Sequence, residues 1–82
     1  MKERKQFFYL NLRKGEFNGV KYQRLDFLDD NGDKYSASCP DYIASIIEDM
    51  DIPKFAPIDI EFFVFPTYGK MKISVINVDT LN

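Results

Sequence analysis

The stretch LDFLDDNGDKYSASCP, residues 25–40, contains the change of pattern that decides the fold. Its first residues alternate between apolar and polar, which is typical of a strand with one buried face. Asp29-Asp30-Asn31-Gly32 then predicts a type I′ hairpin turn. We therefore expect an antiparallel hairpin, with one strand over about 20–28 and the returning strand over 33–39. Leu25 and Phe27 should face inward.

After Ser38 the apolar period changes from two to that of a helix, in which Pro40 can occupy a first-turn position, and we expect the helix over about 41–50. The apolar residues that should face the core are Ile43, Ile46, Ile47 and Met50. Two prolines end the helix, and alternating patterns then predict strands over 58–65 and 70–78. The first should bury Ile58, Ile60, Phe62 and Val64, and the second should bury Met71, Ile73 and Val75.

Residues 7–13, upstream of the hairpin, also alternate and predict the first strand. Phe8, Leu10 and Leu12 share one face, and Phe7, Tyr9, Asn11 and Arg13 share the other. Residues 14–19 contain two glycines and an Asn-Gly pair, so we expect a flexible connection to the second strand there.

Three strands, a helix and two more strands is the order of the five-stranded OB-type barrel, in which the helix plugs one end. We therefore expect an all-β fold with one short helix, forming a single OB-fold-like domain over residues 1–82. The same elements also fit an SH3-like barrel or an open α+β sheet.

Composition excludes several kinds of chemistry. The chain has no His and a single Cys, Cys39, so neither a Ser-His or Cys-His nucleophile nor an intramolecular disulfide can form. A Cys/His zinc site is also excluded, and the acidic turn lacks the Gly and Glu positions of an EF-hand loop. We expect no enzyme, no catalytic residue, no metal and no cofactor. A carboxylate-based hydrolase is the third alternative.

The start of the chain resembles neither a signal peptide nor a membrane span, so we expect a cytoplasmic protein with no membrane partner.

The net charge of −2 hides a segregation along the chain. Residues 1–24 carry a balance of +5, residues 25–61 a balance of −8, and the remainder a balance of +1. An OB-fold binds oligonucleotides on its strand 2–3 face and on the loops that join strands 1–2 and 4–5. The basic residues lie in and around those two loops, which predicts binding of single-stranded DNA or RNA.

Exposed aromatic rings beside these cations would stack on bases without regard to sequence. Phe7, Tyr9, Tyr22 and Tyr68 offer such rings. Tyr35 could also face outward, but a small shift in the register of its strand would turn it into the core. The predicted nucleic-acid-binding residues are Tyr9, Arg13, Lys14, Lys21, Tyr22, Arg24, Tyr68, Lys70 and Lys72.

Two short motifs resemble the filamentous-phage gene V family of single-stranded DNA-binding proteins. Gly19-Val20-Lys21-Tyr22-Gln23-Arg24 is similar to that family's DNA-binding hairpin, and Thr67-Tyr68-Gly69-Lys70-Met71 is similar to its strand 4–5 loop. The ending Ile73-Ser74-Val75-Ile76-Asn77-Val78 resembles its closing strand. The resemblance implies an OB-fold homodimer that coats single-stranded DNA without sequence preference, with Tyr22 and Tyr68 stacking on bases. It also implies an accessory role in phage or mobile-element replication.

A second hypothesis is a protein-interaction module, because acids cluster on the predicted turn and helix. In that interpretation a basic partner docks on Asp29, Asp30, Asp33, Glu48, Asp49 and Asp51.

Overall fold

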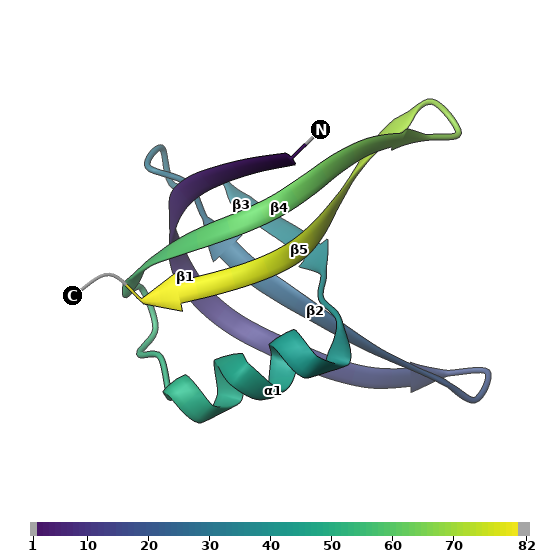
Figure 1. Ribbon diagram of the computed structural model, residues 1–82, viewed down its shortest axis with the longest axis horizontal. Helices are drawn as coiled ribbons and strands as arrows, with labels where there is room; N and C mark the ends of the chain where they lie inside the picture. Colours follow the sequence, from purple (N-terminus) through teal and green to yellow (C-terminus); the bar gives the residue numbers. More distant parts are fainter. Residues whose placement is uncertain (1, 81–82) are drawn as a thin grey trace.

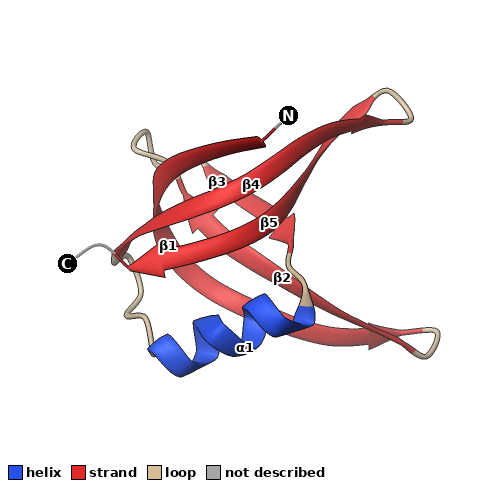
Figure 2. Cartoon of the chain, viewed as in Figure 1, coloured by secondary structure: helices blue, strands red, loops and turns tan. Residues whose placement is uncertain are grey.

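A computed structural model describes residues 2–80 of the chain (Figure 1). The elements follow one another as β1 (Lys2–Phe17), β2 (Val20–Leu28), β3 (Lys34–Ser38), α1 (Asp41–Met50), β4 (Pro57–Thr67) and β5 (Lys70–Thr80). The expected order of three strands, one helix and two strands is confirmed (Figure 2).

The five strands form a closed barrel in the order β1-β2-β3-β5-β4. All neighbouring strands are antiparallel except β3 and β5, which meet in parallel at Ser38 and Ser74. The chain is thus a barrel of OB type, as the sequence predicts. Within residues 2–80, no helix has both the length and the apolar character that crossing a membrane requires.

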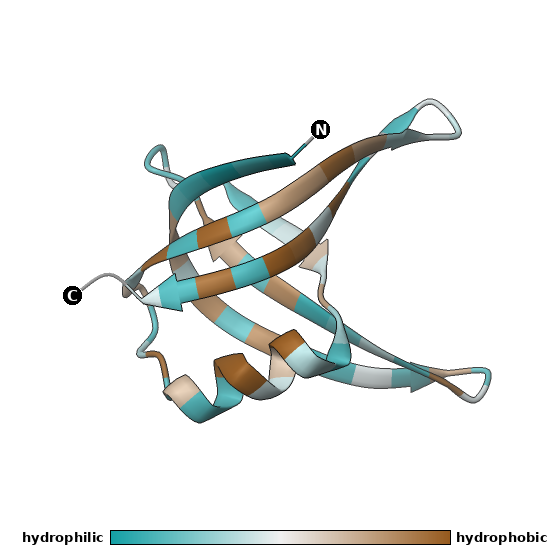
Figure 3. Cartoon of the chain, in the orientation of Figure 1, coloured by the Kyte–Doolittle hydropathy of each residue, from teal (hydrophilic) through white to brown (hydrophobic). Residues whose placement is uncertain are grey.

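The barrel interior and one face of α1 form a single apolar core, and apolar positions alternate along the strands in Figure 3. The expected inward positions of β2, β4 and β5 are confirmed by buried or partly buried side chains at Leu25, Phe27, Ile58, Ile60, Phe62, Val64, Ile73 and Val75. The side chain of Met71 lies outside the described part of the structure.

The assignment of faces on β1 is wrong in its first half. Phe7 is only 6% exposed and its ring lies 4.6 Å from that of Phe27, so it belongs to the core. A bulge between Tyr9 and Asn11 explains the error, because Leu10 is an extra residue opposite β2. The side chains before the bulge therefore have the opposite phase from those after it. Leu12 packs against the core as expected.

The connection over 14–19 is not a flexible loop, which corrects the expectation. β1 and β2 stay paired up to Phe17 and Val20, and Asn18 and Gly19 alone make the turn with positive φ. The β4–β5 hairpin is similarly long and turns at Tyr68 and Gly69. Both hairpins extend beyond the barrel on the right-hand side of Figure 1.

The turn between β2 and β3 is not of type I′. Type I′ requires positive φ at both central residues, yet Gly32 alone has it within this turn. Asp29 organises the loop instead, because its Oδ1 accepts hydrogen bonds from the backbone N–H groups of Asn31 and Asp33, each at 2.9 Å. This Asx geometry replaces the expected turn.

The helix presents a slightly different face from the predicted one. Ile43, Ala44 and Ile47 are buried, whereas Ile46 is 43% exposed and Met50 is half-buried. The helix covers one end of the barrel and contacts the strands through a narrow stripe of side chains. The side chain of Ile46 therefore lies outside the core.

Candidate nucleic-acid interface

One outer face of the barrel is built by β2, β3 and β5. Register places Arg24 opposite Ser38 and Asp26 opposite Ser36, while the parallel contact sets Ser38 beside Ser74. Side chains at alternate positions of a strand share a face, so Lys72 joins Ser74 on the same side. We call this surface, formed by Arg24, Ser36, Ser38, Lys72 and Ser74, the cationic face.

A hollow of about 320 Å³ opens in the cationic face. It is lined by Arg24, Tyr35, Ser36, Ser38, Lys72 and Ile73. The lining contains two cations and no acid, and within residues 2–80 neither Arg24 nor Lys72 forms an ion pair. The two positive charges should therefore attract an anion to this hollow.

Tyr22 extends the cationic face along the β1–β2 hairpin. It pairs with Gly15 and shares the hairpin face with Arg24, two positions further along β2. A Cβ atom at Gly15 would lie 2.3 Å from the Tyr22 ring, so the ring covers the backbone where no side chain stands. The ring is held there, yet the residue remains 45% exposed.

Arg13 lies on the same side as Arg24, but its guanidinium group already forms an ion pair inside the protein. Its guanidinium donates to both oxygens of Asp26, at 2.8 and 3.0 Å, and to Ser36 Oγ at 2.9 Å. Asp26 is 1% exposed. Arg13 is therefore the counter-ion of a buried carboxylate, which leaves its predicted role as a phosphate contact without a free charge.

Three other predicted residues do not reach the cationic face. Tyr9 lies before the bulge and packs against the core, and burial raises the pKa of its hydroxyl. Lys14 pairs with Glu48 of α1, on the helix side of the barrel. Lys21 is adjacent to Tyr22 in the strand and so occupies the opposite face of the hairpin.

The β4–β5 hairpin places the remaining predicted residues together. Tyr68 is fully exposed at the turn, with φ of +51°, in a region that a bulky side chain rarely adopts. Lys70 and Lys72 are exposed and follow it at alternate positions of β5. Phe65 pairs with Lys72, and its ring lies 6.2 Å from that of Phe63.

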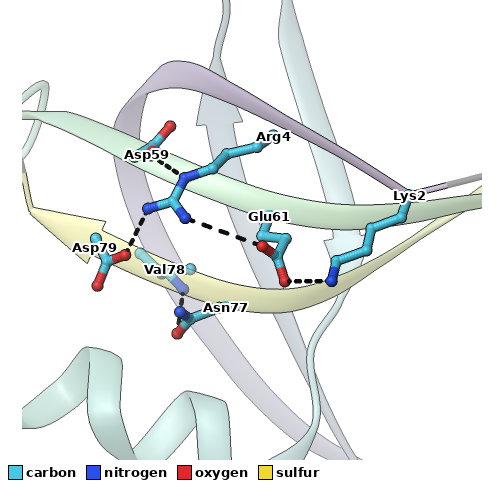
Figure 4. Close-up of polar contacts among 7 residues, drawn as sticks. All are labelled: Lys2, Arg4, Asp59, Glu61, Asn77, Val78 and Asp79. Carbon is cyan, nitrogen blue, oxygen red and sulfur yellow. Dashed lines mark hydrogen bonds and ion pairs between the residues drawn. The ribbon is translucent and has the colours of Figure 1, made fainter.

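Two basic residues near the start of β1, Lys2 and Arg4, form ion pairs with acids, as Figure 4 shows. Arg4 forms ion pairs with Asp59, Glu61 and Asp79, and Lys2 pairs with Glu61 at 3.4 Å. The positive balance of residues 1–24 thus overstates the charge available to a ligand. Of the predicted cations, Lys21, Arg24, Lys70 and Lys72 form no ion pair within the described part of the chain.

Sequence reasoning missed several residues at this surface. Ser36 and Ser38 line the hollow, and their positions follow only from the β2–β3 register. Phe65 stands beside Lys72, and the outward side of the β4 alternation already contained that signal. Tyr35, which a register shift would turn into the core, does not point freely outward: its ring stacks on Phe27 at 5.8 Å and its hydroxyl donates to Asp29 at 3.0 Å. The residue nevertheless remains 39% exposed and lines the hollow.

Two features bear on cysteine and metal chemistry in the described residues. Burial raises the pKa of the Cys39 thiol to about 11, so the thiol stays protonated near neutral pH. Within residues 2–80, no group of three or more acidic, Cys or His side chains is placed to hold a metal ion.

Comparisons with protein-family models, curated proteins and solved structures found no match for this chain.

Proposed function

We propose that the protein binds single-stranded nucleic acid along the cationic face, largely without regard to sequence. The observation that carries this proposal is the hollow between two hairpins that bear exposed tyrosines, lined by two cations, Arg24 and Lys72, that form no ion pair within residues 2–80. Cations can neutralise backbone phosphates, and aromatic rings can stack on any base. Neither contact reads a base edge, so sequence preference should be weak.

The conformation of Tyr68 supports a role in binding. A type I′ turn favours Asn-Gly, which the chain uses at Asn18 and Gly19, but the second hairpin has Tyr-Gly. Left-handed backbone costs a residue other than glycine about 1–2 kcal/mol, and Asn tolerates it best. A fully exposed ring makes no packing that offsets this cost, and base stacking would give it a use.

Resemblance to the gene V family extends the proposal to DNA rather than RNA, to a homodimer, and to replication of a phage or mobile element. The resemblance maps the two base-stacking positions of that family onto Tyr22 and Tyr68, and both residues lie exposed on the hairpins. The protein is proposed to act as a cytoplasmic binder and not as an enzyme.

Titration with fluorescent oligo-dT and oligo-U at two salt concentrations tests the proposed function. We expect saturable binding that weakens as salt rises, because cations released from phosphates drive association. Tighter binding of oligo-dT would support the DNA preference. Absence of binding to both oligomers at low salt would refute the proposal and favour the acidic surface as a docking site for a basic protein.

Replacement of Tyr68 separates stacking from folding. Tyr68→Ala should weaken oligo-dT binding by about 1–3 kcal/mol, whereas Tyr68→Phe keeps the π-face and should cost much less. Tyr68→Asn should weaken binding as Ala does, yet maintain or raise the free energy of unfolding, because Asn-Gly suits the turn. Fluorescence titration and urea unfolding of the same samples measure both effects.

A matched control uses the other hairpin turn. Asn18→Ala changes the corresponding turn position without removing a ring, and it should lower stability slightly with little effect on affinity. If Tyr68→Asn retained the full affinity for oligo-dT, stacking by this residue would be excluded.

A further inference from the structure

The hollow in the cationic face contains a cation that is held by hydrogen bonds to neutral groups. Arg24 Nε donates to Ser36 Oγ at 2.9 Å, and Arg24 Nη2 donates to the Ser36 carbonyl oxygen at 3.1 Å. A guanidinium has five N–H groups, so three of them remain for a ligand. Because both partners are uncharged, the full positive charge of Arg24 is retained.

Ser36 connects Arg24 to a second, buried group. Its Oγ also accepts a hydrogen bond from Arg13 Nη2 at 2.9 Å, and Arg13 holds both oxygens of Asp26. Asp26 is thereby neutralised by Arg13 and not by Arg24. Since Ser36 Oγ accepts from both guanidinium groups, its position is fixed, and with it the orientation of Arg24.

Lys72 contributes to the hollow from β5, and Ser38 belongs to the same lining. A hollow whose lining holds an arginine and a lysine and no acid suits a compact anion with several oxygens. A phosphodiester group of a bound strand has that chemistry.

We propose that this hollow holds one backbone phosphate of the strand between Arg24 and Lys72, and that Asp26 and Arg13 position Arg24 through Ser36. This inference rests on the proposed function and adds to it that the two arginines have different roles. Arg24 contacts the ligand, whereas Arg13 acts inside the protein as a positioning residue.

Salt dependence of oligo-dT binding tests the phosphate contact. Arg24→Gln and Lys72→Gln should each reduce the slope of log K against log salt by up to about 0.7, the value for one phosphate of a single strand, and the double substitution should not exceed that value because both residues hold the same phosphate. Each should also lower affinity roughly tenfold at low salt. Lys54→Gln removes the same charge from an exposed position in the loop after α1, and it should leave the slope unchanged.

Two charge-neutral substitutions test the positioning role. Ser36→Ala keeps the net charge but frees Arg24 Nε, so affinity should fall several-fold, about half as much on a logarithmic scale as with Arg24→Gln. Ser45→Ala on the outer surface of α1 is the matched control and should bind as the wild type does. Ser36→Thr retains the hydroxyl and should restore the affinity.

The outcomes distinguish this inference from the proposed function. If oligo-dT binds with the expected dependence on Tyr68 but Arg24→Gln and Lys72→Gln keep the wild-type salt slope, the phosphate site is overturned and the function stands. If no oligonucleotide binds, titration with inorganic phosphate followed by amide NMR decides. Shifts at Ser36 and Ser38 that vanish in Arg24→Gln would support an anion site, and their absence would overturn it.

Discussion

Phe62→Ala is expected to lower the free energy of unfolding by about 3–5 kcal/mol. Phe62 is 7% exposed in the barrel core, and its ring lies 6.0 Å from that of Phe7. Loss of the ring removes buried apolar area and leaves a cavity that a closed barrel can fill only in part. Urea unfolding followed by circular dichroism measures the effect, and oligonucleotide affinity of the folded fraction should be preserved.

Phe63→Ala is the matched control, because Phe63 is the same residue type one position along β4 but points outward and is 42% exposed. It should cost about 1 kcal/mol or less. Equal losses for the two substitutions would contradict the register of β4, since a shift by one residue exchanges the faces of a strand.

Asp26→Ala is expected to lower the free energy of unfolding by roughly 3 kcal/mol, the lower end of the range for breaking a buried ion pair. The substitution leaves Arg13 without its counter-ion, but that side chain is half exposed and can be partly hydrated. Asp79→Ala is the control. Asp79 also pairs with an arginine, Arg4, but both side chains are about half exposed and the loss should stay below about 1 kcal/mol.

The same substitution should change how stability responds to acid. Burial by itself would raise the pKa of Asp26, but hydrogen bonds from Arg13 and Ser36, together with the charge of Arg13, outweigh burial and lower that pKa. An unfolded Asp titrates near about 3.9, so the contribution of Asp26 is complete at neutral pH and is lost as the pH falls through its lower native pKa.

Thermal unfolding measured from neutral pH down to about pH 3 checks this dependence. The wild type should lose stability over the acid range, and Asp26→Ala should lose less because its stability no longer includes the ion pair. Parallel curves for the two proteins would show that Asp26 is not ionised against Arg13 in the native state.

Local patterns in the sequence were enough to predict the order of the elements. Alternation, the turn residues and the change of period after Ser38 are short-range signals, and they identified five strands, one helix and most of the core. They also identified Tyr68 as an exposed residue, because its neighbours form a turn whatever the rest of the chain does.

The candidate site depended on contacts that no local pattern contains. The bulge at Leu10 reversed the phase of β1, which took Phe7 and Tyr9 into the core and left Arg13 outside beside Asp26. A single extra residue does this because side chains alternate along a strand.

By itself, then, the sequence determined an OB-type order of elements with basic and aromatic residues in and around the two loops that join strands 1–2 and 4–5. Only the tertiary structure decided which cations stay available. Pairing across strands and against α1 neutralises Arg13 and Lys14, whereas closure of the barrel between β3 and β5 brings Arg24 and Lys72 to one hollow. The physical reason is that charges distant in sequence neutralise or reinforce one another only at contact distances, and barrel register sets those distances.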